Sequence, residues 1–309
     1  MSIVYKVSSV LFLVLLSYSN HTFALEALGL IREDGSKLQY YLKKNTPNHD
    51  DLLILVQGSD CNSVTQNARI NQELPKILPN ADVLTVEKYG IDASLRLSEE
   101  IERADCPKAY IDNDSPEQRV SDYLQVLAHV EAGQHYDRVM IVGGSEGGLI
   151  ANMLTANSDR ISYTVSINSG GRKFIDDVIH SIRVDASSEE VFEQESQGFM
   201  GFYNHLLDSE PFELDMSNHG YKWWRGVFSV DQVEVIKQIN TPVLLIQAGQ
   251  DESVSVDSAI EMAEDIASSN PNIEFKLYGD LNHGLKRSTG DDALSLVIED
   301  IQIWLKKQS

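Results

Sequence analysis

The chain has 309 residues, 42% of them hydrophobic, and a formal net charge of -22 at pH 7. This length and hydrophobic content are enough for one large α/β domain with an ordinary core, which excludes a disordered chain. The excess of acidic residues repels nucleic acids and anionic membranes, so an enzyme that acts on nucleic acid is disfavoured.

The first 24 residues have the composition of a secretory signal peptide. Lys6 is followed by an apolar run of seven residues, 10–16, and by a small-x-small pattern at residues 22–24. Such a run is too short to cross a bilayer as a helix, and no later segment is long enough. We expect a signal peptide at residues 1–24, a secreted or periplasmic protein and no membrane anchor. A buried first strand or helix is the alternative.

The reading of the two cysteines, Cys61 and Cys106, depends on the compartment. In an oxidising compartment we expect a disulfide, whereas in a reducing one they would be two small buried thiols. Two cysteines cannot hold a zinc ion unaided, and the chain has no Cys-x-x-Cys or His-x-x-x-His spacing to help them. We therefore expect a disulfide and no metal.

The first part of the chain has the pattern of a sheet edge followed by buried strands. Two β-rich runs, 25–32 and 37–42, are separated by an Asp-Gly hairpin signal and predict an antiparallel edge. Residues 51–57 and 81–87 read as strands, with a weak helix pattern at 66–74 between them. The loop-rich residues 88–115 hold Cys106, so a disulfide would tie this loop to the turn after residue 57.

A helix and a buried strand come next. Ser115 is in position to cap the helix, Pro116 occupies its first position, and Gln118 completes a capping box. The helix leads to an apolar run, residues 139–142, that reads as a strand inside a parallel sheet.

A turn of small residues follows this strand and opens another helix. Glycines at 143, 147 and 148 flank Ser145, because a strand that reverses into a helix within about four residues leaves no room for side chains. Ser145 would then stand at the apex of a strained turn, where a base can reach its hydroxyl. The alternative is a flexible glycine-rich connection with a bystander serine.

The remaining chain continues the alternation of strand and helix after one interruption. Residues 161–167 read as a strand, which completes the pattern of a parallel sheet with right-handed crossovers. Residues 171–240 break the pattern and predict an inserted helical cap, whose aromatic residues form either its own small core or a wall for the substrate. A strand at 242–247, a helix at 257–267, a strand at 273–278 and a closing helix at about 291–306 follow.

Two further residues complete a constellation with Ser145. A serine needs a base to take its proton and a third group to orient that base. His283 lies in a short turn directly after an apolar strand, with glycines on both sides, and Asp251 lies just beyond another buried strand. Glu252 is the fallback for the acid. The chain order Ser145, Asp251, His283 is the order expected for a sheet of this kind.

These motifs resemble those of the α/β-hydrolase fold. Residues 143–148, Gly-Gly-Ser-Glu-Gly-Gly, are similar to the nucleophile elbow of its prolyl oligopeptidase-like and dienelactone hydrolase-like branches, and residues 250–254 and 282–284 resemble the acid and histidine turns of those branches. The resemblance implies a single α/β-hydrolase domain over residues 25–309, with a mostly parallel central sheet flanked by helices and a cap insertion at about 171–240. It also implies that Ser145 is the nucleophile, His283 the general base and Asp251 its orienting acid, with no cofactor.

By the same resemblance, the oxyanion hole uses two backbone N–H groups. One belongs to Glu146, and the other follows the third strand, where this chain has Gln57-Gly58 in place of the His-Gly of many relatives. Ser59 is the expected second donor, with Asp60 as the alternative.

Three functions fit these expectations. The first is an exported serine hydrolase that cleaves a small-molecule ester, as a carboxylesterase does, through an acyl-enzyme. The second is a small serine peptidase acting on short peptides, and the third is a noncatalytic binding protein on the same fold. None of the three requires nucleic acid, and the sequence does not fix the oligomeric state.

Overall fold

The computed structural model describes residues 26–45, 50–100, 102–268 and 270–308. The expected signal peptide, residues 1–24, lies outside the described residues. Within them, no helix is both long and apolar enough to cross a membrane.

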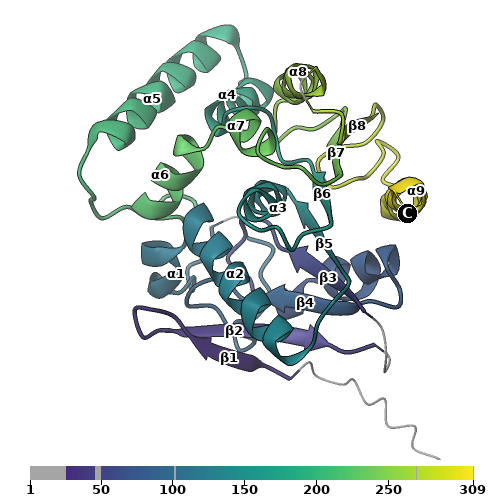
Figure 1. Ribbon diagram of the computed structural model, residues 1–309. Helices are drawn as coiled ribbons and strands as arrows, with labels where there is room; N and C mark the ends of the chain where they lie inside the picture. Colours follow the sequence, from purple (N-terminus) through teal and green to yellow (C-terminus); the bar gives the residue numbers. More distant parts are fainter. Residues whose placement is uncertain (1–25, 46–49, 101, 269, 309) are drawn as a thin grey trace, which may run out of the picture.

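A single mostly parallel sheet runs through the molecule (Figure 1). Its strand order is β1-β2-β4-β3-β5-β6-β7-β8; β2 pairs with β1 and β4 in antiparallel fashion, and all other neighbours are parallel. The expected α/β class and antiparallel edge are thereby confirmed. The strands are β1 (Leu28–Ile31), β2 (Lys37–Lys43), β3 (Asp51–Val56), β4 (Asp82–Val86), β5 (Arg138–Gly144), β6 (Tyr163–Ile167), β7 (Val243–Ala248) and β8 (Ile273–Tyr278).

Helices cover both faces of this sheet. The α-helices are α1 (Lys108–Asn113), α2 (Pro116–Gly133), α3 (Glu146–Ala156), α4 (Phe174–Asp185), α5 (Glu189–Asp208), α6 (Tyr221–Ser229), α7 (Gln232–Ile236), α8 (Val256–Ala267) and α9 (Leu294–Gln308). Three short turns of 3-10 or π type lie between β3 and β4: η1 (Val64–Gln66), η2 (Arg69–Glu73) and η3 (Leu74–Ile77).

The strands are apolar on both faces because each face is buried. Side chains alternate along a strand, so Leu52 and Ile54 of β3 pack with α2 and α3, whereas Leu53 and Leu55 pack with η2, η3 and α9. This double burial explains why the central strands read as continuous apolar runs. It also places their carboxyl ends at one edge of the sheet, where turns can carry polar groups.

The start of α2 corrects one expectation. The Ser115 hydroxyl accepts a hydrogen bond from the N–H of Gln118 at 3.1 Å, as a cap should. The side chain of Gln118, however, donates to Asp122 at 2.8 Å. The capping box is therefore only half formed, because a carboxylate on the next turn competes for the Gln118 amide.

Three other segments differ from expectation. Residues 88–115 include the short helix α1, and residues 66–74 form 3-10 and π turns rather than an α-helix. The last helix begins at Leu294, not at about 291. There, Asp292 pairs with Lys286 in a β-bridge, and its carboxylate accepts the N–H of Leu294 at 2.9 Å. The acidic residues that looked like a first helical turn thus precede the helix.

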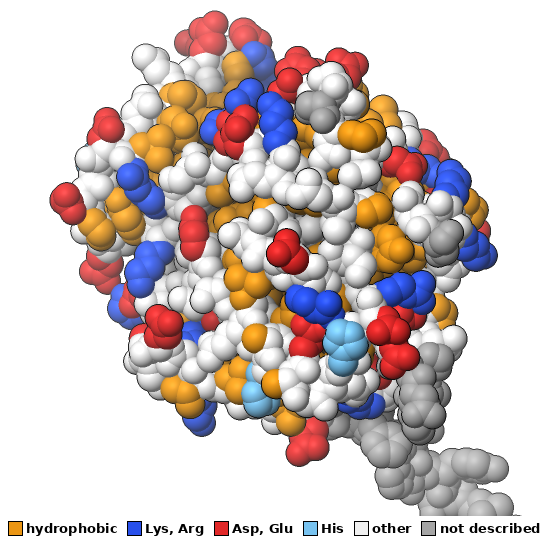
Figure 2. Space-filling model, in the orientation of Figure 1, with side chains coloured by type: hydrophobic (Ala, Val, Ile, Leu, Met, Phe, Trp, Pro, Cys, Tyr) orange, Lys and Arg blue, Asp and Glu red, His pale blue; other side chains and the backbone are white. Residues whose placement is uncertain are grey.

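The helices α4 to α7 follow β6 and precede β7 in the chain, and they lie toward the upper left of Figure 1. Trp223, Trp224 and Phe228 of α6 are buried among side chains of α4 and α5, with Phe199 and Phe174 packed against them at ring centroid distances of 5.6 to 6.2 Å. These aromatic residues form a small core of their own. Figure 2 shows acidic and basic side chains scattered over this face of the molecule rather than separated by sign.

Candidate active site

Ser145 stands between β5 and α3 in a backbone conformation that favours glycine. Its φ is 55° and its ψ is -133°. A non-glycine residue in such a region costs about 1–3 kcal/mol and persists only where its surroundings hold it. Here the N–H of Ser145 donates to Ile167 at the end of β6, and its carbonyl accepts from Gly148, both at 2.8 Å. Strain of this kind at a strand-to-helix turn is typical of an exposed nucleophile.

The flanking glycines are required by close backbone contacts. A Cβ on Gly143 would lie 1.9 Å from the carbonyl oxygen of Gly147, and one on Gly147 would lie 2.4 Å from that of Val56. A Cβ on Gly148 would lie 2.6 Å from the hydroxyl of Ser166. No ordinary side chain fits at such distances, so the glycines allow α3 to pack directly against β3 and β6.

His283 and Asp251 meet at the carboxyl ends of β8 and β7. The Nδ1 atom of His283 lies 2.9 Å from both carboxylate oxygens of Asp251. Asp251 is buried and also accepts the N–H groups of Ser253 and Val254, at 2.9 and 3.0 Å. The fallback acid, Glu252, accepts the backbone N–H of His283 at 3.4 Å instead of contacting the ring. Asp251 is therefore the carboxylate that orients the ring, and the other ring nitrogen, Nε2, is left for chemistry.

Ser145 and His283 line the same cavity, which has a volume of about 260 Å3. No residue of the described segment 171–240 lines it. Its walls come from the ends of β3, β5 and β6, from the turns after β3, and from the segment that follows β8. The other lining residues are Val56, Gln57, Gly58, Asn67, Arg69, Ile70, Leu74, Gly144, Ile167, Asn168, Gly284, Leu285 and Leu294.

The residues expected to supply the oxyanion hole lie beside Ser145. Glu146 is the first residue of α3, where a helix has N–H groups without acceptors of its own. On the other side, a Cβ on Gly58 would lie 3.5 Å from that of Ser145, so the turn after β3 passes directly over the nucleophile. Ser59 follows, and its carbonyl accepts the hydroxyl of Tyr110 at 2.8 Å.

Sequence reasoning missed Asn168, which fixes the histidine turn. Its side chain donates to the carbonyl of His283 at 2.9 Å and accepts the N–H of Ala248 at 2.8 Å. Asn168 thereby joins the ends of β6, β7 and β8. A local signal existed, since asparagine directly after an apolar strand favours the left-handed conformation that this residue adopts, with φ 50°.

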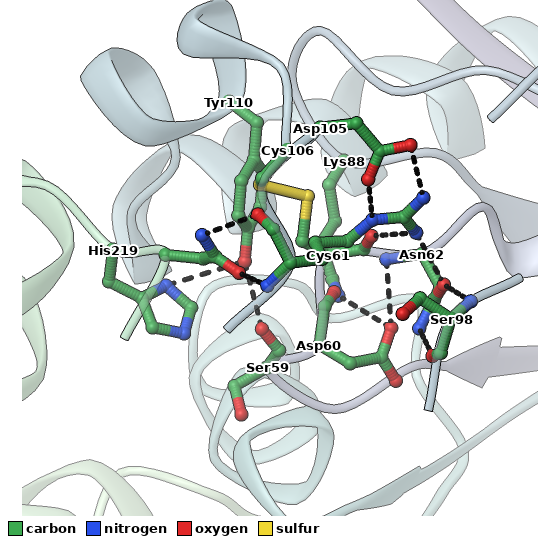
Figure 3. Close-up of a disulfide and its surroundings, with 12 residues drawn as sticks. Ser59, Asp60, Cys61, Asn62, Lys88, Ser98, Asp105, Cys106, Tyr110 and His219 are labelled. Atoms are coloured by element: carbon green, nitrogen blue, oxygen red, sulfur yellow. Dashed lines mark hydrogen bonds and ion pairs between the residues drawn. A yellow bond between two sulfur atoms is a disulfide. The ribbon is translucent and has the colours of Figure 1, made fainter. Parts of the chain in front are cut away.

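The predicted cysteine pair lies next to the turn after β3. A disulfide joins Cys61 and Cys106, whose α carbons are 6.0 Å apart. Asn62, the next residue, donates to the carbonyl of Ser98 and accepts its N–H, at 3.0 and 2.9 Å (Figure 3). The long segment between β4 and α1 is therefore held against the turn that carries Ser59. No group of three or more His, Cys, Asp or Glu side chains among the described residues is arranged to hold a metal ion.

Solved structures of known proteins share this architecture. Est1E from Butyrivibrio proteoclasticus superposes with a TM-score of 0.59 at 16% identity, covering 91% of this chain and 98% of its own. The Pyrococcus furiosus esterase Pf2001 gives a TM-score of 0.55 at 14% identity, with 92% and 91% covered. The chain has the α/β-hydrolase fold. At these identities the structural similarity establishes the fold alone.

Part of the chain also matches a sequence family. Residues 216–305 match the Dienelactone hydrolase family. The matched segment contains Asp251 and His283, while Ser145 lies before it. No curated protein sequence matches the chain. The expected resemblance to the dienelactone hydrolase-like branch is confirmed over this part of the chain, and this match supports a hydrolase.

Proposed function

We propose that the protein is a serine hydrolase that cleaves small esters through Ser145, His283 and Asp251. One observation carries the proposal: the strained Ser145 opens on the same cavity as His283, whose Nδ1 is hydrogen-bonded to the buried Asp251. A serine, a base and an orienting acid at one edge of a sheet form the arrangement needed to activate a hydroxyl.

The reaction runs in two acyl transfers. His283 Nε2 takes the proton of Ser145 as its oxygen attacks the ester carbonyl, and then gives that proton to the leaving alcohol. The acyl group stays on Ser145 until a water, deprotonated by His283, attacks its carbonyl. His283 then gives this proton to the Ser145 oxygen as the bond to the acyl group breaks and the acid leaves. Asp251 stabilises the imidazolium formed in both steps, and its 2.9 Å contact with Nδ1 keeps Nε2 free to accept a proton.

The tetrahedral intermediate carries a negative charge that must be stabilised. We assign this role to the backbone N–H groups of Ser59 and Glu146: Ser59 follows Gly58, which lies over Ser145, and Glu146 is the first residue of α3. Backbone donors fixed before the reaction need no reorganisation when charge develops, and removing one such donor typically lowers kcat by roughly 100- to 1,000-fold.

The cavity favours a small ester over a larger substrate. Its volume of about 260 Å3 lies below the roughly 300–1,000 Å3 of pockets that hold drug-sized ligands. Much of its wall is carbon, from Ile70, Leu74, Leu285 and Leu294, and the guanidinium of Arg69 is paired with Asp292 at 2.9 Å. Among the solved structures with this fold, Pf2001 is named an esterase, and one Est1E structure has ferulic acid bound. Ester cleavage is therefore preferred to peptide cleavage.

The test is turnover of matched ester and amide substrates. We expect the purified protein to hydrolyse p-nitrophenyl acetate or butyrate, and to prefer them to p-nitrophenyl octanoate and to aminoacyl p-nitroanilides. An alkyl ester of ferulic acid tests whether an aryl acyl group is accepted. Ser145→Ala should lower kcat by roughly a million-fold while the protein stays folded, and should abolish labelling by a fluorophosphonate probe. Activity that survives this substitution would mean that Ser145 is not the nucleophile.

We also propose that residues 171–240 act as a cap and that the protein is exported. The cap touches the site at its edge: Trp223 donates to Glu146 at 3.0 Å, and the ring of His180 lies 2.9 Å from the carbonyl of Asp251. Export is supported by the disulfide, which belongs to oxidising compartments. N-terminal sequencing of the secreted or periplasmic protein should find residue 25 first, and an intact Met1 would contradict export with cleavage.

A further inference from the structure

A buried guanidinium lies behind the catalytic serine and touches both segments that flank it. Arg119, on α2, has a side chain only 3% exposed. One of its terminal nitrogens donates to the carbonyl of Gln57 at 2.5 Å, and the other lies 3.2 Å from the carboxylate of Glu146. The other oxygen of that carboxylate accepts the indole N–H of Trp223 at 3.0 Å.

These two contacts fall on the two halves of the proposed oxyanion hole. Gln57 begins the turn that carries Ser59, and Glu146 is the residue after the nucleophile. A guanidinium is planar and rigid, so it sets the distance between the Gln57 carbonyl, to which one nitrogen donates, and the Glu146 carboxylate, with which the other forms an ion pair. An amine or an apolar side chain in its place could not hold both.

We propose that Arg119 is a positioning residue that fixes the separation of the Ser59 and Glu146 N–H groups around the oxyanion. The proposal rests on the function proposed above and goes beyond it, since Arg119 does not line the cavity. It acts through the peptide of Gln57 and the side chain of Glu146.

The charge of Arg119 has a second effect at this place. The Glu146 carboxylate belongs to the residue whose N–H faces the oxyanion, and an unpaired anion there would oppose the negative charge of the intermediate. Burial lowers the pKa of the Arg119 guanidinium, but the neighbouring carboxylates of Glu146 and then Asp114 raise it by more, so that the pKa lies above its ordinary value. The guanidinium therefore stays charged and neutralises Glu146.

The other described polar side chains around Arg119 make different contacts and do not join Gln57 to Glu146. Lys88 is buried and donates to the carbonyl of Asp60, at the far end of the same turn (Figure 3). Burial, followed by Lys88 and Arg119, lowers the pKa of His219 to about 3, so this ring is neutral. Tyr110 donates to Ser59. Among these described neighbours, only Arg119 contacts both Gln57 and Glu146.

The experiment compares Arg119→Met with a matched loss of another buried arginine. Arg32→Met removes a guanidinium that binds Asp122 on the same helix through two hydrogen bonds, at 2.8 and 2.9 Å, but touches no part of the site. We expect Arg119→Met to lower kcat for p-nitrophenyl acetate by roughly 100-fold with little change in KM, because misplacement by about 1 Å costs that much in rate. Arg32→Met should keep the wild-type kcat per folded molecule.

The inhibition constant of a trifluoromethyl ketone distinguishes a positioning role from a merely structural one, because a structural role would leave it unchanged in the folded protein. Ser145 adds to its carbonyl, so the inhibitor carries the oxyanion, and its inhibition constant should rise in Arg119→Met by the same factor as kcat falls. If Arg119→Met does not fold, Arg119→Lys replaces it in the experiment. The lysine keeps a positive charge but cannot contact both groups, so its kcat should also fall.

The proposal is overturned if folded Arg119→Met or Arg119→Lys keeps the wild-type kcat and inhibition constant. It is also overturned if both variants lose activity only in proportion to the folded fraction. Failure of the proposed function gives a different result, because the wild-type protein itself would then not hydrolyse the ester.

Discussion

The contact between the nucleophile turn and β3 can be tested with a single methyl group. In Gly147→Ala the new Cβ would lie 2.4 Å from the carbonyl oxygen of Val56 and 2.8 Å from that of Gln57. Cβ atoms essentially never approach within 3.0 Å, so α3 and the end of β3 must separate by about 0.6 Å. Both partners are backbone, which cannot rotate away as a side chain would.

This separation affects both stability and rate. Forcing an extra carbon into a packed interior typically costs about 1–3 kcal/mol, which we expect as the loss in free energy of unfolding measured with urea. The same shift moves Ser145 relative to Gly58, and since a displacement of about 1 Å can lower a rate 100-fold, we expect kcat to fall roughly tenfold or more.

A matched control uses the same substitution where there is space. A Cβ on Gly201, in α5, would meet nothing within 4 Å. Gly201→Ala should stabilise the protein by about 0.5–1 kcal/mol through its helix propensity and leave kcat unchanged. If Gly147→Ala matched the wild type in both unfolding and kcat, the close packing of the turn on β3 would be wrong.

Three further predictions concern Asp251, Asp177 and the disulfide. Asp251→Asn should lower kcat by roughly 10,000-fold without unfolding the protein, because an amide supports the wrong tautomer of His283; a loss under tenfold would argue against this orienting role. Burial raises the pKa of Asp177 from 3.8 to about 7, so its contribution to stability is present below about pH 4 and is lost as the pH rises through 7. Asp177→Asn should therefore show a smaller fall in Tm between pH 5 and 8 than the wild type, and an identical fall would contradict this. Replacing Cys61 and Cys106 by Ser should cost up to about 4 kcal/mol of unfolding free energy, given a sequence separation of 45; an unchanged Tm would exclude a stabilising bridge.

The parts of the fold that the sequence predicted are those with a local pattern. The strands with buried apolar runs, such as β3 and β5, were predicted close to their observed ends, because burial on both faces leaves no polar position after their first residue. The turn at Ser145 was predicted because the steric demands of a strand-to-helix reversal act within a few residues. Asp251 and His283 were predicted as its partners by the same reasoning, since each follows a strand end.

The features that were missed depend on contacts between distant residues. Arg119 binds the carbonyl of a residue 62 positions earlier, and Asn168 binds that of a residue 115 positions later. Nothing in the helix pattern of α2 distinguishes Arg119 from a surface arginine. The start of α9 was predicted too early for a similar reason. Asp292 forms a β-bridge with Lys286 in the preceding turn and therefore lies outside the helix.

The origin of the cavity walls shows where the reaction's selectivity can be altered. Apart from the catalytic strand ends, the wall side chains belong to two stretches, residues 67–74 and 284–294, that are remote in the chain and adjoin in space. A library of variants confined to these stretches would reshape the space for the acyl or alcohol group while leaving Asp251 and the aromatic core of α4 to α6 untouched. New specificities should therefore arise from the turns that precede β4 and α9 rather than from the helical insertion, none of whose described residues lines the cavity.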